Sequence, residues 1–183
     1  MENIKKSTLD FLNDLKNNNN RDWFIKNRSA YSEAKDNFES FIQEIINKII
    51  DFEPIMKGLE VKSCIYRINR DIRFSNDKSP YKSHFGAYIV RGGKKNGDKF
   101  AGYYIHIEPG KSIIAGGAYM LPKPWLSAIR EKIDEEPEPT DLRVGRCFDF
   151  FLFLCRFCQS VVSGKRRRDY RRDRGQDGQG HHH

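Results

Sequence analysis

Apolar residues in the first fifty positions of the chain recur every three or four residues. Leucines between positions 9 and 15 keep this spacing and predict a short amphipathic helix, which Ser7 or Thr8 can cap. A run of four asparagines then ends it. From 21 to 52 the same spacing, now carried by aromatic residues and isoleucines, predicts a longer helical stretch with one buried face.

After residue 58 the pattern changes to alternating residues rich in β-branched and aromatic side chains. This alternation predicts four strands, at 61–68, 83–92, 100–109 and 112–121. GGKKNGD and PGK separate the last three and predict hairpin turns, and GGKKNG lacks the pattern of a P-loop. Pro122 and Pro124 introduce a further predicted helix at 125–136. The predicted fold class is therefore α+β, with N-terminal helices packed on a mostly antiparallel sheet and followed by a helix.

The composition of the chain changes near residue 140. Up to 139 there are sixteen lysines and seven arginines, whereas 140–183 holds one lysine and nine arginines and closes with GHHH. We predict a single domain over 1–139 and a compositionally foreign basic tail over 140–183, as a shifted reading frame or a tag would give. Three cysteines and the terminal histidines of the tail are poorly spaced for zinc, and we predict no metal site there; the cysteines are Cys147, Cys155 and Cys158.

The formal net charge of +8 is unevenly distributed. Five of the eight surplus positive charges fall after residue 139, so the predicted domain is nearly balanced and its charge is weak evidence for nucleic-acid binding. No secretory signal pattern opens the chain, and its longest apolar run is interrupted by Asp149 and Arg156. Cys64 is the one cysteine before residue 140. We therefore expect a cytoplasmic protein with no membrane partner.

A dense group of charged residues occupies RINRDIRFSNDKSPYKSHFG, residues 67–86. Arginine forks and lysine point charges in a long connection between strands suit an anionic ligand, so we predict binding of a phosphorylated or carboxylated small molecule. The predicted ligand-binding residues are Arg67, Arg70, Asp71, Arg73, Asp77, Lys78, Lys82 and Glu108.

Two other interpretations of the same residues stay open. The basic block can bind nucleic acid, with Phe74, Tyr81 and Tyr88 stacking on bases. Alternatively, the arginines and aspartates pair with one another and only pin the connection to the sheet. No sequence pattern identifies a cofactor.

His106 and Glu108 alternate in YYIHIEP, which places their side chains on one face of a strand. An imidazole oriented by a carboxylate can transfer a proton, so we predict a catalytic role for His106 or His84, with Tyr81 orienting the ligand. His84, His106 and Glu108 can also supply ligands to a metal. Because two ligands on one strand are too few, we predict no metal site.

Three segments of the chain resemble a bacterial family of conserved hypothetical proteins, the domain of unknown function 2461. These segments are NNNNRDWFIKNRSAY, YRINRDIRFSNDKSPYKSHFGAYI and GYYIHIEPGKSIIAGGAYMLP. The resemblance runs from about residue 7 to about residue 136, and the chain departs from the family pattern after it. It implies an α+β domain with a shared motif and no established activity.

Overall fold

A computed structural model describes residues 3–118 and 122–135 of the chain. The helices are α1 (Lys6–Asn17), α2 (Arg21–Lys26), α3 (Arg28–Phe52), α4 (Val61–Cys64) and α5 (Lys123–Glu135), with 3-10 turns η1 (Pro54–Met56) and η2 (Lys94–Asn96). The strands are β1 (Phe85–Ile89), β2 (Gly102–Ile107) and β3 (Ile113–Gly117). None of the helices within these ranges combines the length and apolar character that a membrane span requires. The predictions for the tail lie outside the described residues.

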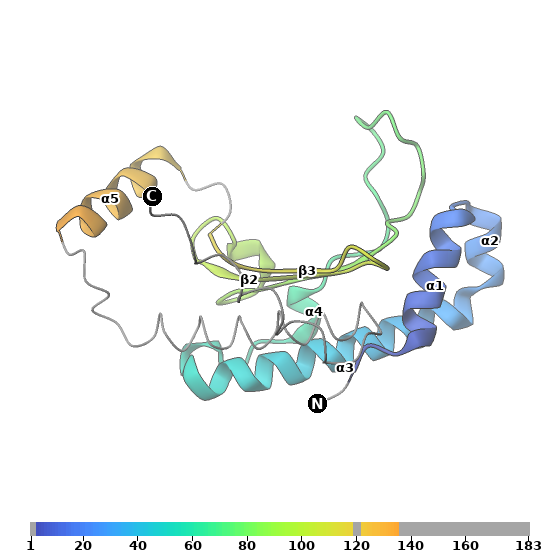
Figure 1. Cartoon of the computed structure of the whole chain (residues 1–183), viewed down its shortest axis with the longest axis horizontal. Coiled ribbons are helices and arrows are strands. Elements are labelled where there is room, and N and C mark those ends of the chain that lie inside the picture. The colour runs from blue at the N-terminus through green and yellow to red at the C-terminus, as the bar shows by residue number, and fades with distance from the viewer. Residues whose placement is uncertain (1–2, 119–121, 136–183) are drawn as a thin grey trace, which may run out of the picture.

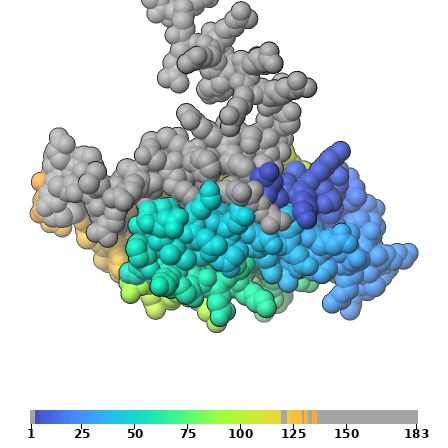
Figure 2. Space-filling model, turned by 90° about the horizontal axis from the view of Figure 1, so that it is seen from below, coloured from blue at the N-terminus to red at the C-terminus, as the bar shows by residue number. Residues whose placement is uncertain are grey.

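The three strands form one antiparallel sheet in the order β1-β2-β3, and α3 crosses one of its faces (Figure 1). Seen from that side, residues of the N-terminal helices make up most of the described surface (Figure 2). The opposite face of the sheet is the side toward which the connection between residues 69 and 81 extends in Figure 1. The predicted α+β class, with helices on an antiparallel sheet and a helix after it, is confirmed.

The hydrophobic core lies between α3 and the sheet. Fully buried residues on α3, such as Phe38, Ile42 and Ile45, belong to the same cluster as alternate residues of the strands. Phe38 stacks on Phe85 of β1 with ring centroids 5.2 Å apart. Because strand side chains alternate between faces, this arrangement turns one set of β1 and β2 residues toward α3 and leaves the other set on the opposite face, which we call the open face.

The prediction of a strand over 61–68 is wrong at its start, where α4 forms instead. The Ser63 hydroxyl donates to the Glu60 carbonyl at 2.6 Å, and the Ser63 backbone N–H donates to the same oxygen at 3.0 Å. These local bonds favour a helical turn over an extended chain. Only Ile65 then forms a bridge to β1, opposite Ala87. Cys64, predicted to be buried within a strand, is buried but helical.

The predicted helical stretch over 21–52 is divided at Asn27, where α2 ends and α3 begins. The Asn27 side chain donates to the Trp23 carbonyl at 2.9 Å, and the Trp23 N–H donates to the side chain of Asn20 at 2.9 Å. Two asparagine side chains thus hold the short helix at its ends. The cap of α1 also differs from the prediction, because neither Ser7 nor Thr8 occupies it and Lys5 does.

Thr8 instead turns inward, where it meets a buried asparagine of α3. The Asn37 Oδ1 accepts from the Thr8 hydroxyl at 2.8 Å and from the Lys5 N–H at 2.9 Å, while Asn37 Nδ2 donates to the Asn3 carbonyl at 3.0 Å. One side chain therefore satisfies three polar groups and fastens the N-terminal segment to the central helix.

We expect Asn37→Ala to lower the free energy of unfolding by about 1–3 kcal/mol, because it leaves the buried Thr8 hydroxyl and the Lys5 N–H without their acceptor. Urea denaturation followed by circular dichroism measures the change. Asn47→Ala is the matched control, since Asn47 lies on the exposed side of the same helix and bonds only to Gln43 among the described residues. Both substitutions raise helix propensity equally. Equal stability of the two variants would contradict the fastening role.

Candidate functional site

The open face of the sheet carries polar and aromatic side chains where the other face carries the core. Tyr88 on β1 and Tyr104 and His106 on β2 belong to this face, and His84 precedes β1 in the same alternation. Glycines and alanines fill the positions between them. The small residues therefore leave space above this face, and the large side chains form the sides of that space.

A pocket of about 920 Å³ occupies this face. Its wall comes from the strands, from η2 and from the chain before β1. The residues that carry its chemistry are Tyr66, Lys82, His84, Tyr88, Lys94, Lys95, Asp98 and Tyr104. The volume lies in the range of pockets that hold small molecules or cofactors.

Three tyrosines give the pocket aromatic walls, and glycines allow these rings to come close. A Cβ at Gly97 would lie 2.6 Å from Tyr88 Cε1, so only glycine leaves this ring in place. The Tyr88 hydroxyl donates to the Gly117 carbonyl at 3.3 Å. Burial raises the pKa of Tyr66, Tyr88 and Tyr104, so their hydroxyls stay protonated and can donate hydrogen bonds.

The pocket contains three lysines and a single aspartate among its described lining residues. The Lys82 ammonium donates to the Arg67 carbonyl at 3.0 Å and lies 5.6 Å from the centre of the Tyr66 ring. Burial, followed by the charge of Arg67, lowers the pKa of Lys82. Lys94 donates to the Ser63 carbonyl at 3.2 Å, which fixes the turn after β1 against α4. The pocket thus holds positive charge that its own carboxylates do not balance.

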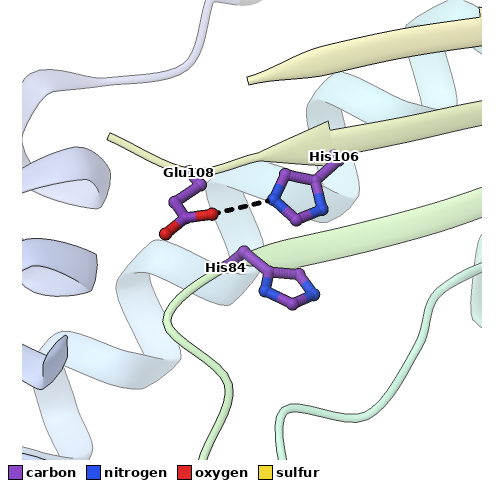
Figure 3. Close-up of side chains that lie close together, drawn as sticks. All are labelled: His84, His106 and Glu108. Carbon is purple, nitrogen blue, oxygen red and sulfur yellow. Dashed lines mark hydrogen bonds and ion pairs between the residues drawn. The ribbon is translucent and has the colours of Figure 1, made fainter. Parts of the chain in front are cut away.

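His84, His106 and Glu108 meet at one end of this face (Figure 3). The His106 Nε2 lies 3.1 Å from Glu108 Oε2, and the His106 ring stacks on that of His84 with centroids 4.1 Å apart. As predicted, the side chains of His106 and Glu108 lie on the same side of the chain, although β2 ends at Ile107 and Glu108 directly follows it. Continuing the register of Phe85 with Ile107 by one position places His84 opposite Glu108.

Burial, His106 and the ammonium of Lys82 together lower the pKa of His84 to about 4, so this imidazole is neutral at pH 7. Burial alone would raise the pKa of Glu108. The hydrogen bond from His106 and the electrostatic effects of His106, His84 and Lys111 outweigh that effect, and the net pKa is lowered. Glu108 is accordingly a carboxylate at neutral pH.

Two further hydrogen bonds extend the cluster. The Tyr104 hydroxyl lies 3.2 Å from His106 Nδ1, and the Ser83 hydroxyl donates to Glu108 Oε1 at 3.4 Å. A carboxylate, an imidazole and a phenol in sequence can orient the imidazole and pass a proton toward the pocket, where Tyr104 lies. One ring nitrogen each of His84 and His106, together with the Glu108 carboxylate, can also hold a metal ion.

The charged block predicted to bind an anion lies mostly apart from the pocket. Arg70 donates to the Asp77 carboxylate and, at 2.6 Å, to the Ser79 hydroxyl. Arg73 makes two bonds to Asp71, at 2.9 and 2.7 Å.

Hydrogen bonds within the block also shift the acidity of its aspartates. The backbone N–H of Ser79, followed by Arg70, lowers the pKa of Asp77, and Arg73 lowers that of Asp71. Lys78 donates to the Ile72 carbonyl at 3.1 Å. The block therefore contains the internal pairs that the ion-pair interpretation expects.

Of the predicted site residues, Lys82 and His84 line the pocket, while His106 and Glu108 lie beside it. Tyr81 does not reach it, because its ring stacks on Phe24 in the core at a centroid distance of 4.0 Å. The remaining basic residue, Arg67, contributes its carbonyl to Lys82.

Sequence reasoning missed Tyr66, Tyr104, Lys94 and Lys95 as pocket residues. The two lysines belong to the GGKKNG turn. The sequence shows that this turn is rich in glycine and lysine, but it does not show that the turn lies over the sheet. Tyr104 lies two residues before His106, so the alternation that paired His106 with Glu108 also contained it.

Comparison with known proteins gives one finding. A model of the family described as conserved hypothetical protein (DUF2461) matches residues 7–148, beyond the end near 136 that the sequence resemblance suggested. No curated protein and no solved structure matches the chain. Because the matched range covers most of the 183 residues, the chain belongs to the DUF2461 family of conserved hypothetical proteins.

Proposed function

We propose that this protein binds a small phosphorylated or carboxylated molecule in the pocket on the open face of the sheet. The observation that carries the proposal is the imbalance of charge in that pocket, where three lysines accompany one aspartate. Desolvated ammonium groups repel one another unless an anion lies between them, and the lowered pKa of Lys82 reflects burial and a neighbouring positive charge. An anion in the pocket would offset the repulsion between the lysines and would stabilise the charged form of Lys82.

The lysines retain hydrogen-bonding capacity for a ligand. An ammonium group has three N–H donors, and Lys82 gives one to the Arg67 carbonyl. Among the described residues Lys95 has no hydrogen-bond or ion-pair partner, although it lines the same pocket. Hydrogen bonds between charged groups are about twice as strong as neutral ones. Phosphate or carboxylate oxygens fit these donors.

The aromatic walls favour a ligand that has a ring or another planar part besides its anionic group. Tyr66 and Tyr104 line the pocket and can stack on such a part, and Tyr66, which is 37 % exposed, also offers a hydroxyl donor. The volume of about 920 Å³ suits a ligand as large as a nucleotide or a sugar phosphate.

The contacts give less support to anion binding by the charged block and to nucleic-acid binding. Arg70 and Arg73 already have carboxylate partners inside the block. Of the aromatic residues proposed for base stacking, Tyr81 and Tyr88 are each 8 % exposed, and only Phe74 is open, at 97 %. A single exposed ring is a small platform for a single strand.

We expect Lys82→Met and Lys95→Met each to raise the dissociation constant of the bound anion about tenfold or more, because each removes a charged donor and keeps an apolar stem. A thermal-shift screen of phosphate, pyrophosphate, nucleotides, sugar phosphates and dicarboxylates selects the probe, and calorimetry measures its affinity. Lys16→Met on α1 is the matched control, since Lys16 is exposed and is not among the residues that line the pocket. Equal affinities in all three variants would refute the pocket as the anion site.

We expect Arg70→Ala to leave the affinity for that anion within about twofold and to speed hydrogen exchange in residues 69–81. Arg70 joins the two arms of this connection through Asp77 and Ser79, whereas Arg73 pairs with Asp71 only two positions away. Arg73→Ala therefore serves as the control and should change exchange less. If Arg70→Ala weakens anion binding more than Lys82→Met does, the site belongs to the charged block instead.

A further inference from the structure

The geometry points to a site for a divalent transition metal ion held by His84, His106 and Glu108. The sequence pattern predicts no metal here, because only His106 and Glu108 lie on one strand segment. Pairing of β1 with β2 adds the third, from the residue that precedes β1. Metal binding at this site is independent of anion binding in the pocket, because it can be measured without an anion.

The three donor groups already lie close enough for one ion. One ligand atom from each residue can be chosen so that all three lie within 4.8 Å of one another. Two ligands at about 2.0–2.1 Å from a tetrahedral zinc ion are separated by roughly 3.3 Å. His106 Nε2 and Glu108 Oε2 are 3.1 Å apart, so an ion can replace the proton that these two atoms share.

The outer hydrogen bonds leave the correct atoms for the metal. Tyr104 contacts His106 through Nδ1, and Ser83 contacts Glu108 through Oε1, so Nε2 and Oε2 remain to face the ion. Metal-bound histidines and carboxylates usually have such second partners, which fix the ring and the tautomer. All three residues are half-buried, which limits competition from water.

Metal binding requires the imidazole rings of His84 and His106 to change their relative orientation. The rings of His84 and His106 are nearly parallel, with an interplanar angle of 24°, and their nitrogen lone pairs lie in the ring planes. The rings must tilt apart for both lone pairs to point at one ion. Figure 3 shows His84 on the chain that leads into β1, beside the end of β2. Rotation of the His84 side chain would tilt its ring away from that of His106.

The donor set selects the kind of ion. Two imidazoles and a carboxylate suit zinc, cobalt and iron in the divalent state and leave further coordination positions for water or a ligand. Magnesium prefers oxygen ligands and serves as the negative probe. His84 and Tyr104 line the pocket, so an open position on the ion lies at the pocket's end.

The test uses the full chain with the other candidate ligands removed. The background variant carries His181→Ala, His182→Ala, His183→Ala, Cys147→Ser, Cys155→Ser and Cys158→Ser, because these tail residues can bind metals themselves. Titration with Co²⁺ followed by visible absorption, and with Zn²⁺ against a chromophoric chelator, measures stoichiometry and affinity. We expect one equivalent of either ion and none of Mg²⁺.

We expect His84→Ala, His106→Ala and Glu108→Gln each to weaken Zn²⁺ binding at least tenfold, and Tyr104→Phe to weaken it about tenfold through His106. Asp98→Asn is the matched control, because Asp98 is a pocket carboxylate outside the cluster and its loss should leave Zn²⁺ affinity unchanged. Circular dichroism verifies that each variant is folded.

A second measurement needs no substitution within the cluster. Zn²⁺ should protect His84 and His106 of the background variant from diethylpyrocarbonate, as read by mass spectrometry of their peptides. Less than one equivalent of Co²⁺ and Zn²⁺, binding that survives loss of both histidines, or no protection would overturn the inference.

Discussion

Packing of α3 against one face of a three-stranded sheet is the contact on which the rest of the structure depends. A small sheet gains stability by burying one face, and here the isoleucines and phenylalanines of α3 pack against that face within one hydrophobic cluster. Each strand alternates, so the residues opposite the core are released from packing and can be polar. Histidines, tyrosines and glycines occupy those positions on β1 and β2.

The open face is shaped by small residues as much as by large ones. Gly86 lies beneath Tyr66 and Tyr104, where a Cβ would be in ordinary contact with both side chains, at 3.5 and 3.6 Å. Gly97 is more constrained, because a Cβ there would push the Tyr88 ring out of place. The pocket therefore depends on the close approach of glycine backbone to tyrosine rings. The sheet beneath these rings holds them in position.

Two proposed sites share this face and are electrostatically compatible. The lysines supply positive charge around the pocket, and a divalent ion at the histidine cluster would add to it. An anionic ligand would then be attracted by both, while the ion would be held by the Glu108 carboxylate and by one ring nitrogen each of His84 and His106. The charged block of residues 67–86 has a different role, since two of its arginines, Arg70 and Arg73, pair with its own aspartates.

Local periodicity in the sequence determined the helices, three of the strands and the shared face of His106 and Glu108, because each depends on residues a few positions apart. It failed at 61–64, where side-chain bonds to nearby carbonyls favoured a helical turn, and at Asn27, which divides a continuous apolar pattern. Strand register brought His84 to His106, and the turn after β1 brought Lys94 and Lys95 over the sheet. These are contacts between residues distant in sequence, so only the tertiary structure decided them.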